Sequence, residues 1–144
     1  MTAGLLRRLG AMLYDLLIVV ALMFIVTALF LPLTGGEAIT PGDSGVLERI
    51  YQAALLLVVV LFFCVFWTRR GQTVGMLAWR LRVERADGST PSWRDALIRL
   101  AGACVSLAAL GLGYVWIWID SDRLAWHDRW SGTRVVVLPK KKKT

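Results

Sequence analysis

The chain has 144 residues, of which 57% are hydrophobic, and its mean hydropathy is +0.60. This composition excludes a disordered chain and argues against an ordinary soluble domain. The formal net charge of +7 would suggest nucleic-acid binding in a soluble protein. Here the basic residues flank apolar segments, so membrane orientation and anionic headgroups explain them more simply, and we expect no nucleic-acid partner.

The first predicted element is a membrane-spanning helix over residues 9–33. Eighteen of these residues, 16–33, carry no charge, which suits a hydrocarbon core of about 30 Å. Asp15 lies at the entry of this run, where a carboxylate needs a partner or a function to offset its cost in lipid. Arg8 is on the same helical face but about 10.5 Å away along the axis, so we expect a second partner for Asp15.

The second predicted span covers residues 47–67. The loop before it has a net charge of −2, whereas residues 68–95 after it have a net charge of +3. Because short cytoplasmic loops collect Lys and Arg, we expect the N-terminus and residues 68–95 to be cytoplasmic. The first apolar run is too long for the hydrophobic region of a cleavable signal peptide, so we interpret it as a retained span.

A third apolar stretch, residues 100–119, allows two topologies. As one span it would place the C-terminal tail outside, although that tail has a net charge of +4. Gly111 and Gly113 interrupt the stretch, so we favour two helical pieces, residues 92–110 and 111–122, that form a hairpin with both ends at the cytoplasm. Irregular backbone at membrane depth must be covered, so the hairpin should pack against the first two spans.

Two short strands are predicted on the cytoplasmic side. Residues 80–85 alternate charged and apolar side chains, and residues 132–138 form a β-branched run, so pairing with each other is the simplest arrangement. The predicted fold is an all-α membrane protein with a single domain over residues 1–144. It is a small multi-helix bundle with two full spans, a third/fourth helix hairpin and a short cytoplasmic β-strand pair. A basic tail, residues 139–144, is expected to attract anionic lipid.

Ionisable residues next to the apolar segments are the candidate functional groups. They are Arg8, Asp15, Arg99, Asp120, Asp122, His127 and Asp128. Arg99 either extends to the headgroups or faces inward as the missing partner of Asp15. His127 is a candidate proton acceptor, with a hydrogen-bonded interface role as the alternative. The seven tryptophans flank apolar segments and are interpreted as an aromatic belt at the headgroups.

We expect neither an enzyme nor a cofactor. The chain has no phosphate-binding loop, no Gly-x-Ser-x-Gly elbow and no His-Glu-x-x-His motif. An intramembrane hydrolase is a weaker alternative, because Ser106 has no His beside it in the sequence. The two cysteines, Cys64 and Cys104, lie in apolar segments without metal-ligand spacing, which predicts packing and no metal site.

Several motifs occur in a fixed order along the chain. They are Arg8…Asp15, Gly71-Gln72-Thr73-x-Gly75, Arg82-Val83 followed by Asp87-Gly88, then Arg99, His127-Asp128, Gly132-Thr133 and Val135-Val136. This ordered set resembles the RDD family of bacterial membrane proteins over nearly the whole chain. The family is named for one arginine and two aspartates, to which Arg8, Asp15 and Asp128 correspond. Similar proteins commonly carry Lys where this chain has Met76.

The resemblance implies a multi-pass protein of the bacterial plasma membrane, with transport as the usual suggestion. In our leading hypothesis Arg8, Asp15 and Arg99 line a polar path for an unidentified ion or small solute. With so few spans, such a path would need a homo-oligomer. The alternative is an accessory or scaffold protein whose Arg/Asp cluster is structural and whose basic face binds lipid or a membrane protein partner.

Overall fold

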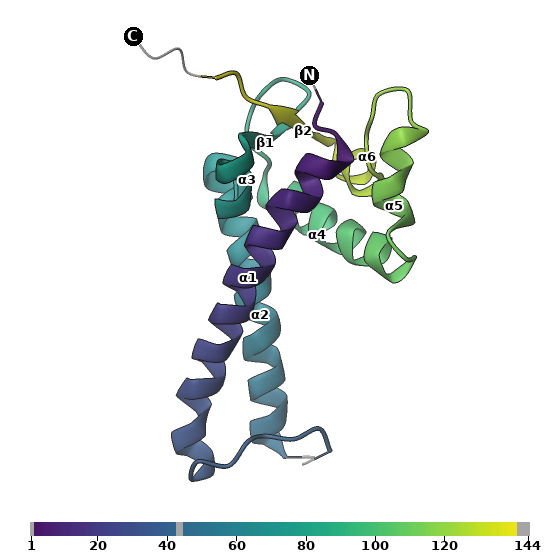
Figure 1. Cartoon of the computed structure of the whole chain (residues 1–144). Coiled ribbons are helices and arrows are strands. Elements are labelled where there is room, and N and C mark those ends of the chain that lie inside the picture. Colours follow the sequence, from purple (N-terminus) through teal and green to yellow (C-terminus); the bar gives the residue numbers. More distant parts are fainter. Residues whose placement is uncertain (1, 43–44, 141–144) are drawn as a thin grey trace.

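The computed structural model describes residues 2–42 and 45–140 (Figure 1). Asp43, in the loop between the two predicted spans, and most of the basic tail, Lys141–Lys143, lie outside the described residues. Two long helices form an extended hairpin. The shorter helices and a two-stranded sheet gather at the end of this hairpin where the N-terminal and C-terminal segments lie.

The two long helices are α1, Leu5–Phe30, and α2, Val46–Arg70. Both are long and apolar enough to cross a membrane, and their apolar side chains are largely exposed, as lipid-facing helices require. A 3-10 helix, Leu31–Thr34, extends α1 before the chain turns at Gly35. The two predicted spans are therefore confirmed as helices. However, α1 begins four residues earlier than predicted, so Arg8 lies within it.

A short helix and the first strand follow α2. The helix α3, Val74–Trp79, begins after Thr73, whose side chain accepts a hydrogen bond from the Met76 N–H at 3.3 Å. Strand β1, Leu81–Arg85, buries alternate side chains, as the predicted period of two requires. Gly71 has a φ of 67° between α2 and α3, and its carbonyl oxygen accepts a hydrogen bond from the Val83 N–H at 2.6 Å.

The third apolar stretch is broken, as predicted. Helix α4, Trp93–Ala108, starts with a capping box in which Ser92 and Asp95 bond reciprocally to each other's backbone N–H. Gly111, with a φ of 77°, leads into α5, Leu112–Val115, and a 3-10 helix that ends at Trp118. The second piece is bent by 106° relative to α4. The two pieces form the predicted hairpin, because left-handed backbone at the break does not continue a helix.

The last elements return to the first strand. Helix α6, Trp126–Ser131, precedes strand β2, Thr133–Val137, which pairs antiparallel with β1. The predicted strand pair is therefore confirmed. The N-terminal residues also join this sheet, since Thr2 bridges to Val136 and the Ala3 N–H donates to the Val135 carbonyl at 2.8 Å. This contact was not predicted, and it fixes the start of α1 beside β2.

Two apolar clusters hold these elements together. The larger joins α1, α2 and α4 to the sheet and consists of Ala3, Ala11, Cys64, Trp67, Leu81, Val83, Ala96 and Val135. The smaller joins the start of α1 to α5 and the loop before α6, through Leu5, Tyr114, Ile117 and Ala125. Charged side chains lie buried beside both clusters, and they form the candidate site.

Candidate functional site: a buried ion cluster and two cavities

Asp128 is the centre of a buried ion cluster. Arg8 Nη1 donates to Asp128 Oδ2 at 2.6 Å, and Arg99 Nη1 forms an ion pair with Asp128 Oδ1. The Ala125 N–H also donates to Asp128 Oδ2, at 3.0 Å. Because α1, α4 and α6 each contribute one residue, the cluster joins three helices that lie far apart in the sequence.

The backbone and nearby hydroxyl groups hold the two arginines in place. Arg8 Nε donates to the Ala3 carbonyl at 3.1 Å, so the sheet contact of the N-terminus also orients this guanidinium. Arg99 Nη1 donates to Thr133 Oγ1 at 3.2 Å, and that hydroxyl lies 2.6 Å from Ser131 Oγ. The N-terminal segment beside β2 therefore orients Arg8, and β2 itself orients Arg99.

The electrostatics of the cluster favour an ionised Asp128. Burial alone would raise the pKa of this carboxyl, but the Arg99 and Arg8 guanidinium groups outweigh burial and hold its pKa well below its usual range. Two cations and one anion leave the cluster with one excess positive charge. An ionised carboxylate between two guanidinium groups is the arrangement that offsets the cost of burial.

His127 is neutral at physiological pH. Burial, and then the positive charge of Arg99, lower its pKa to about 3, although Asp128 acts in the opposite direction. His127 Nε2 lies 3.7 Å from Asp128 Oδ1, which is too long for a hydrogen bond, and the neutral ring makes no ion pair. Its ring packs on Tyr114 with a centroid distance of 4.7 Å. His127 therefore belongs to the cluster as an uncharged group.

Asp15 has different partners from those predicted. Thr73 Oγ1 donates to Asp15 Oδ2 at 2.5 Å, and the Gly75 N–H donates to Asp15 Oδ1 at 2.8 Å. Both oxygen atoms are thus bound by the first residues of α3. The second partner expected for Asp15 is thus the start of α3. Arg99 does face inward, but both guanidinium groups bind Asp128 and neither pairs with Asp15.

The glycine of this contact is required by close packing. A Cβ atom on Gly75 would lie 2.1 Å from the Ala11 carbonyl oxygen and 3.0 Å from Asp15 Cγ. Only glycine therefore allows α3 to approach α1 closely enough for the backbone N–H to reach the carboxylate. The Gly-x-Thr-x-Gly motif supplies both hydrogen-bond donors to Asp15.

Trp67 belongs to the site and not to the aromatic belt. It is buried, and the Arg99 guanidinium carbon lies 5.2 Å from the centroid of its ring, a cation–π geometry. The belt prediction is wrong for this residue, because α4 covers the end of α2 where Trp67 lies. Trp118 and Trp130 are exposed, as a belt requires.

Asp120 does not join the buried cluster, although it was predicted to do so. It forms an ion pair with Arg129 and accepts a hydrogen bond from the Leu124 N–H at 2.9 Å. These contacts hold the loop before α6 against that helix. The Leu124 hydrogen bond, and then Arg129, lower the pKa of Asp120. Asp122 lies beside Arg129 in the same loop, at 3.6 Å.

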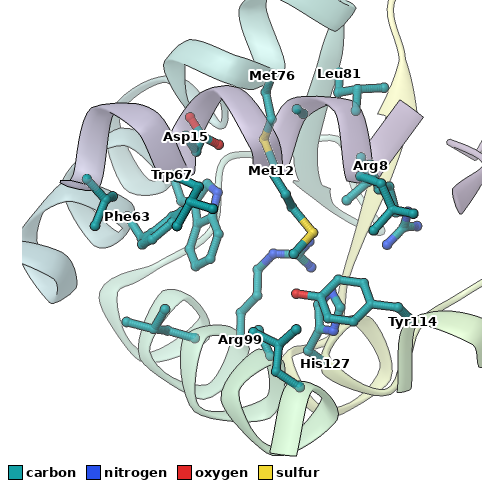
Figure 2. A pocket seen from close by; sticks show the side chains of 18 of the residues that line it. Arg8, Met12, Asp15, Phe63, Trp67, Met76, Leu81, Arg99, Tyr114 and His127 are labelled. Atoms are coloured by element: carbon teal, nitrogen blue, oxygen red, sulfur yellow. The ribbon is translucent and has the colours of Figure 1, made fainter. Parts of the chain in front are cut away.

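Two cavities lie on either side of the cluster. The first, of about 550 Å³, lies between α1, α2, α4 and α5 and includes both arginines of the cluster in its wall, together with Asp15. Figure 2 shows Arg99 crossing this cavity between Trp67 on one side and Tyr114 and His127 on the other. The second cavity, of about 520 Å³, is lined by Asp128, Arg129, Thr133 and neighbouring residues of the sheet end.

The family comparison agrees with the motifs of the chain. The family model described as "RDD family" matches residues 2–132, which is nearly the whole chain. Searches of curated proteins and of solved structures find no match. The matched residues contain the buried cluster, the Asp15 contact and both helices that can cross a membrane. The chain therefore belongs to the RDD family.

Proposed function

We propose that this membrane protein transports an ion or a small solute across the bacterial plasma membrane. The observation that supports the proposal most strongly is the position of the ion cluster between two cavities. Arg8 and Arg99 line the first cavity, and Asp128, to which both are bound, lines the second. A solute that passes between the cavities must separate or bypass these ion pairs, so the cluster acts as the barrier of the path.

In this proposal Asp15 is the side chain whose charge changes during transport. Its carboxylate lies in the wall of the first cavity, and its bonds to Thr73 and Gly75 join α1 to α3. A change of charge at Asp15 would weaken this joint and let the two helices move apart. Two membrane-spanning helices enclose little space, so a homo-oligomer in contact with anionic lipid is the assembly we propose.

Flux through reconstituted vesicles tests this function. Uptake of radiolabelled Na⁺, K⁺ and 1-octanesulfonate into vesicles is compared for the wild type, Asp15→Asn and Asp87→Asn. Asp87 lies on an exposed turn and lines neither cavity, so Asp87→Asn is the matched control. We expect Asp15→Asn, whose side chain cannot change charge, to reduce flux at least about tenfold at unchanged yield. Equal flux of the two variants would contradict the proposal.

A scaffold function is the second candidate, and one observation favours it. Both oxygen atoms of Asp128 and both oxygen atoms of Asp15 already have hydrogen-bond partners within the protein. A fully paired cluster can serve assembly alone. In that case the wild type gives no flux in any gradient, and Asp15→Asn lowers only the yield of assembled protein.

A further inference from the structure

We propose that the first cavity binds an amphipathic organic anion, with one short hydrocarbon chain and an anionic oxygen head such as a carboxylate, sulfonate or phosphate. The inference rests on the proposed function, because it uses the same cavity, and it names the substrate class. It is carried by three properties of the cavity, which are an apolar wall, unpaired nitrogen atoms and an excess of positive charge.

Most of the cavity wall is apolar. Side chains from α1, α2 and α4 form it, including Met12, Leu16, Val59, Phe63, Leu100 and Ala103. The volume of about 550 Å³ lies within the range of about 300–1,000 Å³ that is typical of small-molecule pockets. Such a wall binds a hydrocarbon chain.

Unpaired nitrogen atoms occupy the polar part of the wall. Arg8 Nη2, Trp67 Nε1, Arg99 Nε and His127 Nδ1 are buried and have no hydrogen-bond partner among the described residues. Each of these side chains lines the cavity, and none of the four residues is more than 5% exposed. Three of the four atoms are obligatory donors, and the fourth donates in one tautomer. Acceptor oxygens of a ligand are the partners that these donors lack.

The charge in this part of the cavity selects an anion. Arg8 and Arg99 bear two positive charges against the single negative charge of Asp128, and His127 is neutral. Asp15 also lines the cavity, but its negative charge lies outside the ion cluster, at the contact with Thr73 and Gly75. Figure 2 shows Asp15 near Trp67 and away from Arg8 and His127. An oxyanion beside the arginines therefore neutralises the excess charge.

Binding of 1-octanesulfonate tests the ligand class. This probe keeps its charge at every working pH and has one chain of suitable size. Radiolabelled probe is dialysed to equilibrium against the full chain in phosphatidylcholine nanodiscs, with empty nanodiscs subtracted. We expect 1-octanol, methanesulfonate and octyltrimethylammonium to compete at least about tenfold more weakly than unlabelled probe, since each lacks one required feature. Equal competition by any of the three overturns the proposal. Loss of probe binding in nanodiscs that contain an anionic two-chain phospholipid also overturns it, because the cavity would then bind the lipid and not a ligand with one short chain.

Two pairs of variants locate the site. Trp67→Phe removes one N–H and keeps an aromatic ring, so we expect about tenfold weaker binding. Trp118→Phe is the matched control, because Trp118 is exposed and outside the cavity. Ala103→Phe fills the cavity and should abolish binding, whereas Ala101→Phe, on the exposed face of the same helix, should not. Wild-type binding by both cavity variants overturns the proposal.

The binding result is independent of the flux result. If 1-octanesulfonate binds as predicted but no gradient produces flux, the inference stands and the proposed function fails. If Na⁺ or K⁺ produces flux and the probe does not bind, the proposed function stands and the inference fails. The ligand series on the wild type decides the question even where a variant does not fold.

Discussion

At the scale of single residues, the adjacent residues His127 and Asp128 differ in ionisation state, although both face the same cations. Asp128 stays ionised because two guanidinium groups face it, while His127 stays neutral because burial and the same cations oppose its protonation. The side chain of Asp128 has no exposed surface, so its ionisation depends on the two guanidinium groups beside it. This difference between adjacent residues has a measurable consequence for pH.

Stability should fall as the pH is lowered from about 6.5 toward 3. The unfolded chain binds a proton on His127 near pH 6.5, whereas the folded chain does so only near pH 3. Because the unfolded state then holds the extra proton, the free energy of unfolding decreases by up to about 1.4 kcal/mol per pH unit. Unfolding in mixed SDS micelles between pH 7 and 5 measures this slope.

His127→Phe is the matching variant, since phenylalanine keeps the contact with the Tyr114 ring but does not titrate. Its free energy of unfolding should change little between pH 7 and 5. A slope equal to that of the wild type would show that another group causes the loss, and the assignment to His127 would be wrong.

At the scale of elements, the start of α3 is bound to the first spanning helix through Asp15, a contact that we call the clamp. Its first residues bind both oxygens of Asp15, and Gly75 lets the two backbones approach closely. The clamp explains why a carboxylate persists at the entry of a span, where an unpaired one would be costly. The clamp also defines one side of the first cavity, because Met76 lines it.

Gly75→Ala should destabilise the protein by about 1–3 kcal/mol, the usual cost of overpacking a close contact. The added Cβ would overlap the Ala11 carbonyl oxygen, so α3 must move away from Asp15. Gly4→Ala is the control, because Gly4 has a φ of −69° and an added Cβ there would meet no atom within 4 Å. SDS unfolding of both variants measures the difference, and equal stability would contradict the clamp.

Much of this element structure could be predicted from the sequence. Apolar length identified α1 and α2, alternation identified β1, and the glycine at 111 identified the break in the third stretch. The partner of Asp15 could not be predicted in this way. Two arginines and two aspartates allow several pairings, and the actual one depends on a backbone N–H of α3, which no side-chain pattern reveals. The cation–π contact of Trp67 likewise depends on tertiary packing.

At the scale of the whole molecule, the sheet joins the two ends of the chain. Thr2 bridges to Val136, so the N-terminus and the last strand lie together (Figure 1). We therefore expect these two segments to lie on the same side of the membrane. The distribution of positive charge predicts the cytoplasmic side.

Reporter fusions test this topology. An alkaline phosphatase fused after the last residue should be inactive, and the same reporter inserted after Gly36, in the loop between α1 and α2, should be active. A fluorescent protein that folds only in the cytoplasm should give the opposite pattern. Phosphatase activity at the C-terminus alone would contradict both the shared side of the two ends and the broken third stretch.

The measurement that tests the central claim most directly is a double-mutant cycle between Arg99 and Asp128. The free energy of unfolding in mixed micelles is compared for Arg99→Gln, Asp128→Asn, the double variant and the wild type. A buried ion pair predicts that each single variant is costly and that the two effects differ from additivity by at least about 1.5 kcal/mol. Effects that add to within about 0.5 kcal/mol would mean that these side chains do not interact, and the buried cluster would be contradicted.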